Sequence, residues 1–280
     1  MKTGLVLEGG SMRGLYTVGV LDCLLDHRLY FPYVIGVSAG AGNGVSYVTR
    51  QRGRSYRVDT AYLKDKRYLS FSNYRKTKSV FGMGFIFDEI PNRLDPLDYQ
   101  ALRNSDCEFL VGVTDAETGL PVYFGKEKLD NQCTVLSASS SMPVFSPPVF
   151  FEGRAYLDGG TTDPIPVKKA LADGCERLVV VLTRDRTFIK PPEKGRLIYR
   201  RVLKKYPNMI RALDERHIVY NETLDFLRVL EQEGTAIVIA PKKPLPVGRF
   251  ERNLEHLNTA YQMGMQDASK NLEQIANFLA

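Results

Sequence analysis

Apolar and polar residues along the chain alternate in blocks that predict strands and helices in turn. Apolar runs at 3–7 and 33–37 predict two buried strands. The segment between them, 13–29, carries apolar residues at helical spacing, and a further helix is predicted at 39–50. A strand, a helix and a second strand in this order predict parallel neighbours joined by a right-handed crossover, the start of an α/β fold.

The rest of the chain continues this alternation after one irregular stretch. Residues 51–106 hold only short amphipathic pieces, at 56–68, 85–94 and 96–103, and predict an inserted helical cap. A hairpin of strands 108–115 and 121–124 is predicted next, followed by a helix at 130–139, a short strand ending at residue 158 and a helix running to 173. The last third is predicted as a strand at 177–183, a basic helix at 195–205, a long helix at 207–232, a strand at 236–239 and a terminal helix at 252–278.

Composition is that of an ordinary globular protein. The chain has 280 residues, of which 44% are hydrophobic and 25% are charged. Its four cysteines are scattered without a C-x-x-C pair, which favours reduced thiols in the cytoplasm over disulfides or a metal site. The N-terminal apolar run stops at Glu8, so we expect no signal peptide.

Charge and hydropathy define the surfaces that the chain offers. The uncharged stretches 29–49 and 131–151 are interrupted by proline, glycine or serine, so neither is expected to span a membrane. The net charge of +6 is concentrated in 50–78, with ten Lys and Arg against two acids, and in 184–205, with nine against two. These basic segments are either solvated helix faces or peripheral contacts with anionic lipid. We do not expect nucleic acid, because the interleaved tyrosines are better placed to pack than to stack on bases.

The most informative motif joins the second strand to the next helix. Gly36-x-Ser38-x-Gly40 lies between the apolar run 33–37 and the helix predicted at 39–50. This is the context of a nucleophile elbow, in which glycines two residues either side of a serine permit a tight turn that exposes the hydroxyl. The motif predicts Ser38 as a nucleophile.

A glycine-rich loop, Gly9-Gly10-Ser11-Met12-Arg13-Gly14, follows the first strand. A dinucleotide loop would need a glycine where Ser11 stands, and a phosphate-binding loop of the Walker type would need G-K-[ST]. The remaining possibility is an oxyanion hole formed by the N–H groups of Gly9, Gly10, Ser11 and Met12, because this loop and Ser38 follow neighbouring strands. Arg13 would hold the loop or an anionic head group.

Ser38 needs a base, and the sequence offers two kinds. His217 and His256 follow Asp158, in the order of an α/β-hydrolase triad, but only two strands fit before Ser38. Both histidines also lie in polar helical sequence, which predicts solvated surface residues. Asp158, at the end of a strand and before Gly159 and Gly160, is the simpler partner. A Ser38–Asp158 dyad requires a dehydrated site that makes the carboxylate more basic.

Taken together, these motifs resemble the patatin-like phospholipase family, and most closely its uncharacterised bacterial members. The family pattern G-G-G-x-[K/R]-G is matched by residues 9–14, G-x-S-x-G by 36–40 and D-G-[G/A] by Asp158-Gly159-Gly160. The segment 138–148, rich in Ser, Pro and Phe, also looks like the family's and would wall an acyl groove or serve as a connector. One departure is Ser11 in place of the third glycine, which would destabilise the loop by about 1 kcal/mol if φ is positive there.

The resemblance implies a three-layer α/β/α sandwich with a mostly parallel sheet over residues 4–170. Residues 171–280 would form a C-terminal region that completes the same fold or stands apart. It also implies a Ser38–Asp158 dyad, no cofactor and no metal, and hydrolysis of lipid acyl esters. Two alternatives stay open: an acyltransferase that uses the same dyad, and a catalytically idle protein that binds lipid through its basic segments.

Overall fold

A computed structural model describes residues 1–280 and places eight strands in one mixed sheet. The strands are β1 (Thr3–Leu7), β2 (Tyr33–Val37), β3 (Glu108–Asp115), β4 (Pro121–Gly125), β5 (Val149–Phe151), β6 (Arg154–Asp158), β7 (Arg177–Val181) and β8 (Ala236–Ile239). The five strands β3-β2-β1-β7-β8 run parallel in that order, and β4, β5 and β6 pair antiparallel at the β3 end.

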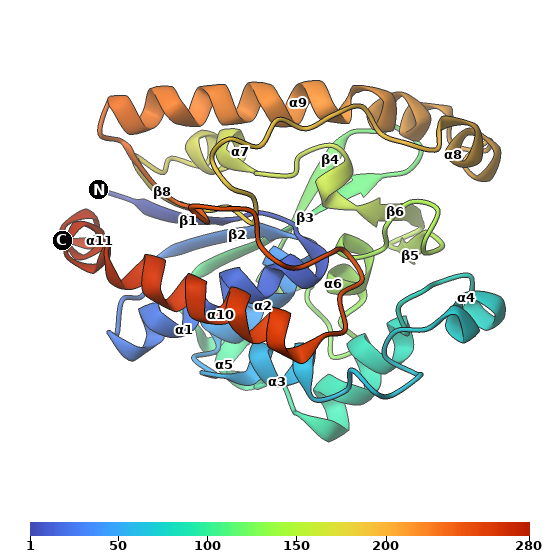
Figure 1. The fold of residues 1–280 in the computed structure, drawn as a ribbon, viewed down its shortest axis with the longest axis horizontal. Coiled ribbons are helices and arrows are strands. Elements are labelled where there is room, and N and C mark those ends of the chain that lie inside the picture. The colour runs from blue at the N-terminus through green and yellow to red at the C-terminus, as the bar shows by residue number, and fades with distance from the viewer.

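Helices cover both faces of this sheet, which gives the expected three layers (Figure 1). One face carries α7 (Val167–Ala172) and the long α9 (Pro207–Gln232), and the other carries α1 (Gly14–Asp26), α2 (Ala39–Val48) and α10 (Leu254–Ser269). The strands β1, β2 and β7 are buried along almost their whole length, as central strands of a covered sheet must be.

The remaining helices are short. They are α3 (Arg54–Thr60), α4 (Phe71–Thr77), α5 (Tyr99–Asn104), α6 (Thr134–Ser139), α8 (Arg196–Val202) and α11 (Leu272–Leu279), with a π-helical segment at Phe85–Leu94. The segment from α3 to α5 is the helical cap expected at 51–106. Its apolar side chains form a cluster with Met12, Leu15 and Val18 at the start of the chain.

The C-terminal third is built into the same sheet. The strand β7 pairs with β1, and β8 extends the sheet beyond β7. On the other face α10 lies against α1 so closely that a Cβ atom at Gly264 would be 2.0 Å from the carbonyl oxygen of Tyr16. A reciprocal approach occurs at Gly19, where a Cβ atom would be 2.1 Å from the carbonyl of Tyr261. These glycines allow the two helix backbones to touch.

Sequence periodicity located most elements and misjudged some of their ends. The strands at 3–7, 33–37 and 236–239 and the helix at 207–232 are confirmed at their expected bounds. The single terminal helix expected at 252–278 is wrong, because the chain breaks at Lys270–Asn271 and continues as α11. None of the helices combines the length and the apolar character that a membrane-spanning segment requires.

Candidate active site

Ser38 lies at the sharp turn between β2 and α2. Its backbone has φ 53° and ψ −128°, a conformation that a residue with a side chain seldom adopts. The turn is tight because α2 begins at once: a Cβ atom at Gly40 would be 2.5 Å from the carbonyl oxygen of Leu7, and one at Gly36 would be 2.7 Å from the nitrogen of Ala41. The two glycines of the elbow motif therefore have no room for a larger residue.

The register of β3 explains how a residue 120 positions later reaches Ser38. Val37, the last residue of β2, pairs with Gly112, and Asp158, the last residue of β6, pairs with Val113. Because β4 occupies the opposite edge of β3, β2 and β6 follow each other along the same edge. The ends of these two strands meet head to head, and so do the residues that terminate them.

The two side chains are hydrogen-bonded. Ser38 Oγ donates to Asp158 Oδ2 at 2.7 Å, and Asp158 Oδ1 accepts the N–H of Gly160 at 2.7 Å. Ser38 is 8% exposed and Asp158 is 5% exposed. Burial raises the pKa of the Asp158 carboxyl, against the opposing effects of the Ser38 hydroxyl, the Arg216 charge and the Gly160 N–H. A buried carboxylate of raised basicity, held against a hydroxyl, can accept its proton.

No histidine shares this hydrogen-bond network. His27 contacts the carbonyl of Cys23, His256 contacts Glu251, and the Nδ1 atom of His217 is buried without a partner on α9. The interpretation of His217 as a solvated surface residue is therefore wrong, since its ring is partly buried.

A second serine supports the elbow and was not singled out from the sequence. The backbone N–H of Ser38 donates to Ser139 Oγ at 2.8 Å, and that hydroxyl donates to the carbonyl of Gly112 at 2.6 Å. Ser139 is fully buried at the end of α6. It ties the strained turn to β3. Nothing distinguishes it locally from the neighbouring serines 137, 140 and 141, so sequence reasoning had no signal for it.

The glycine loop lies beside Ser38, as expected from neighbouring strands. A Cβ atom at Gly9 would be 3.2 Å from Cβ of Ser38. The N–H groups of Gly10, Ser11 and Met12 have no acceptor within the protein. The assignment of Gly9 as a fourth free donor is wrong, because its N–H donates to the carbonyl of Pro164 at 3.3 Å.

The loop is anchored at its start by Glu8. This buried carboxylate accepts hydrogen bonds from the backbone N–H and the hydroxyl of Thr183, after β7, and from the hydroxyl of Tyr220 on α9 at 2.7 Å. Burial raises its pKa despite these donors. In the sequence, Glu8 is recognisable only as the end of an apolar run, because both of its partners are far away along the chain.

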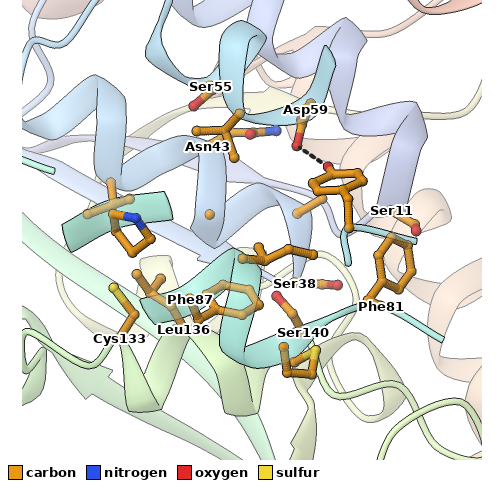
Figure 2. Close-up of a pocket in the computed structure, with 18 of the residues that line it drawn as sticks. Ser11, Ser38, Asn43, Ser55, Asp59, Phe81, Phe87, Cys133, Leu136 and Ser140 are labelled. Atoms are coloured by element: carbon orange, nitrogen blue, oxygen red, sulfur yellow. Dashed lines mark hydrogen bonds between the residues drawn. The ribbon is translucent and has the colours of Figure 1, made fainter. Parts of the chain in front are cut away.

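Two cavities meet at Ser38. The first, about 120 Å³, lies under the helical cap and is lined mostly by apolar side chains, among them Phe81, Phe87 and Leu136 (Figure 2). The second, about 490 Å³, lies on the side of the C-terminal third and is lined by many charged residues. Ser11, Ser38 and Met142 border both. The segment 138–148 therefore contributes walls to both cavities rather than acting only as a connector.

One acidic group interrupts the apolar lining. The carboxylate of Asp59 on α3 accepts a hydrogen bond from the hydroxyl of Tyr68 at 3.2 Å (Figure 2). Burial raises its pKa to about 7, against the opposing effects of this hydroxyl and of the Arg54 charge. Near neutral pH the cavity therefore holds a carboxyl that exchanges between its neutral and its charged form.

Comparison with known proteins decides the family. A family model described as patatin-like phospholipase matches residues 5–171, well over half of the chain. The chain belongs to the patatin-like phospholipase family. A second model, a domain of unknown function (DUF6363), matches residues 206–280.

Among its relatives, the uncharacterized protein YjjU of Escherichia coli is 26% identical over 94% of this chain and 75% of its own length. Lysophospholipase NTE1 of Scheffersomyces stipitis is 22% identical over 95% of this chain but only 18% of its own length, so the chain spans a small part of that protein. Among solved structures, that of VipD from Legionella pneumophila aligns with 98% of this chain and 67% of the VipD chain, at 14% identity and a TM-score of 0.48.

This member of the patatin-like family departs from the motif at Ser11, and the structure shows what the serine does. Ser11 has φ 51°, the left-handed conformation that glycine adopts most easily. Its hydroxyl donates to the backbone carbonyl of Arg249 at 2.8 Å. A glycine could not make this link between the loop and the C-terminal segment, so the hydrogen bond offsets the backbone strain.

Proposed function

We propose that this protein hydrolyses acyl esters of lipids, with Ser38 as the nucleophile and Asp158 as its base. The observation that carries the proposal is the 2.7 Å hydrogen bond between these buried side chains at a strained elbow. Membership of the patatin-like phospholipase family and likeness to a lysophospholipase support a lipid ester as the substrate.

The reaction would proceed in two proton-balanced steps. Ser38 Oγ attacks the ester carbonyl carbon while its proton passes to Asp158 Oδ2. The N–H groups of Gly10, Ser11 and Met12 are available to stabilise the negative oxygen of the tetrahedral intermediate. The bond to the alcohol then breaks, and Asp158 returns the proton to the departing alkoxide. Water attacks the acyl-serine and gives one proton to Asp158. The bond between Ser38 Oγ and the acyl carbon then breaks, Asp158 returns the proton to Ser38 Oγ, and the fatty acid leaves.

The apolar cavity is suited to the acyl chain. It opens at Ser38 and runs under the cap between side chains such as Val45, Ile86 and Leu136. Burial of methylene groups there would contribute roughly 0.8 kcal/mol each. The acyl part of the ester would therefore lie on the cap side of Ser38 and the alcohol part on the other side.

We also propose that one end of the molecule contacts an anionic membrane surface. Phe71 of α4 is 83% exposed and Leu197 of α8 is 86% exposed, and both helices lie at the same end of the molecule (Figure 1). They belong to the basic segments 50–78 and 184–205. Apolar side chains surrounded by cations are typical of elements that lie on anionic lipid.

Vesicle flotation tests this contact. Replacing Leu197 and Phe71 together by Glu should weaken binding to vesicles that contain anionic lipid by about tenfold or more. Val229 lies near the C-terminal end of α9, the end away from α8. Val229→Glu is therefore the matched control and should bind like wild type. Equal binding by all three proteins would contradict the membrane contact.

Release of fatty acid from a lysophospholipid tests the hydrolysis. Ser38→Ala and Asp158→Asn should each lower the rate by at least about 10³-fold, because each removes a partner in proton transfer. Ser137→Ala, a nearby serine whose hydroxyl is not part of the network, should retain activity. Transfer of the acyl group to an added lysolipid instead of water would replace hydrolysis with the acyltransferase alternative.

A further inference from the structure

The larger cavity beside Ser38 is strongly cationic. Its lining includes six basic side chains, from Arg13, Arg184, Lys190, Lys194, Arg216 and Arg249. The acidic side chains in the lining are Asp158, which is bonded to Ser38, and Glu193. All but one of the six cations come from beyond residue 171, outside the stretch that matches the patatin-like family model.

Four of these six cations, Lys194 and three of the arginines, have no acidic partner. Arg216 and Lys190 both contact Glu193, at 2.8 and 3.0 Å, so that carboxylate is already shared. Arg13, Arg184 and Arg249 make no ion pair, and the Nε atom of Arg13 is buried without any hydrogen-bond acceptor. Arg184 only stacks on the ring of Phe188, with 4.4 Å between the guanidinium carbon and the ring centroid.

The protein holds these charges together against their mutual repulsion. Burial and the neighbouring Arg184 charge lower the pKa of Arg13 to about 10. Burial and the Arg216 charge lower the pKa of Arg249 as well. Partly desolvated, unpaired guanidinium groups destabilise the empty site, and a bound anion would remove that cost.

Arg249 is fixed in place by the residue that departs from the family motif. The Ser11 hydroxyl holds the backbone carbonyl of Arg249, which brings its side chain to the same cavity as the glycine loop. The loop and Arg249 are therefore linked by a direct hydrogen bond. An anion bound at Arg249 would lie in the cavity that borders Ser38 on the side away from the acyl site.

We propose that this cavity is the binding site for a phosphate group on the alcohol part of the substrate, with Arg249 and Arg184 as its principal ligands. The proposal rests on the proposed hydrolysis at Ser38. It assigns the substrate as an acyl ester whose alcohol carries an anionic phosphate monoester. A choline or ethanolamine group is disfavoured, because Glu193 is the only acid free of the Ser38 bond and it already neutralises two cations.

A head-group series with one acyl chain tests the substrate assignment. We compare kcat/KM for oleoyl lysophosphatidic acid, oleoyl lysophosphatidylcholine and monooleoylglycerol below their critical micelle concentrations. Wild type should prefer the phosphate monoester. Arg249→Gln and Arg184→Gln should each reduce the ratio of phosphate monoester to neutral ester by about 10- to 100-fold. Arg249→Lys should retain part of the preference that Arg249→Gln loses, because lysine keeps the positive charge but not the forked guanidinium group.

Arg211→Gln is the matched control. Arg211 lies on α9 five residues before Arg216, and its side chain is 78% exposed and pairs with Glu215 on the surface. It should leave the ratio unchanged. A wild-type enzyme without preference for the phosphate monoester, or an Arg249→Gln variant that slows all three substrates equally, would overturn the proposal.

Calorimetry with inorganic phosphate on the Ser38→Ala protein separates the anion site from the reaction. Saturable binding that weakens at least tenfold when Arg249→Gln is added supports the site, even if no lipid is hydrolysed and the proposed function fails. Absence of binding together with an unchanged head-group ratio refutes it. If the ratio changes without binding of free phosphate, the site recognises the phosphate only as part of the lipid, as proposed.

Discussion

The N-terminal and C-terminal parts of this chain contribute to the same site in different ways. Residues 5–171, which match the patatin-like family, hold Ser38, Asp158 and the glycine loop. Residues beyond 171, most of which match the model of the domain of unknown function, extend the sheet through β7, anchor Glu8 and supply most of the cations near Ser38. Under the proposed function, the first part would carry out the chemistry and the second would select the lipid.

If the N-terminal part needs the C-terminal part in order to stay folded, a substitution that forces the two parts away from each other should unfold both. Gly264→Ala places a Cβ atom 2.0 Å from the backbone oxygen of Tyr16, which α10 can relieve only by moving away from α1. We expect a loss of about 3 kcal/mol or more in the free energy of unfolding, measured by urea denaturation. A helical glycine with open space around it, Gly42, is the control, and Gly42→Ala should stabilise by up to about 1 kcal/mol.

Two transitions for Gly264→Ala, with the first confined to α10 and α11, would contradict this view. They would show that the C-terminal helices form an appendage that can detach. A single cooperative transition at lower urea is the expected outcome.

The helical cap, by contrast, belongs wholly to the N-terminal part and contains a carboxyl in an apolar cavity. Asp59 has a pKa of about 7 in the folded protein, well above its ordinary value of 3.8. Between these values the folded protein binds a proton that the unfolded chain has released, so this group makes stability fall as pH rises from about 4 to 7.

Asp59→Asn should remove that dependence. We expect the free energy of unfolding to rise by about 2 kcal/mol at pH 8 and by less at pH 4.5. Asp59 is half-buried, so solvent screens part of the effect of its charge. Thermal unfolding across this pH range measures it. An equal change at both pH values would show that the charge of Asp59 is not the cause.

The smallest effect is expected where the two parts are joined. Ser11→Gly relieves a positive φ but loses the hydrogen bond to Arg249, so the two changes of about 1 kcal/mol each should nearly cancel in stability. The head-group ratio should nevertheless fall, because Arg249 is no longer held to the loop. Unchanged selectivity in Ser11→Gly would show that this link does not position Arg249.

The same division explains what the sequence could predict. Ser38 and its glycines form a local turn whose steric needs are visible in five consecutive residues, and Asp158 ends a strand before two glycines. The fold class followed from the order of apolar runs, which is also local. Ser139, Glu8 and Arg249 act through partners more than 100 residues away, and their own surroundings in the sequence are unremarkable.

Errors in the sequence analysis have equally physical causes. The helical period is continuous from 252 to 278, so no local signal marked the break at Lys270–Asn271. The motif predicts Gly9 as a free donor, because nothing in it shows that Pro164 lies opposite the Gly9 N–H. The second error concerns a contact that only the folded chain creates.

Covalent labelling by a fluorophosphonate probe tests the central claim, that Asp158 activates Ser38, most directly. Wild type should be labelled on Ser38, as located by peptide mass spectrometry, and Ser38→Ala should not be labelled. Asp158→Asn should be labelled at least about 10³-fold more slowly, because the serine loses its proton acceptor. Thermal unfolding of this variant at the wild-type temperature is the control that it is folded. Labelling of Asp158→Asn at the wild-type rate would contradict the account and require another base.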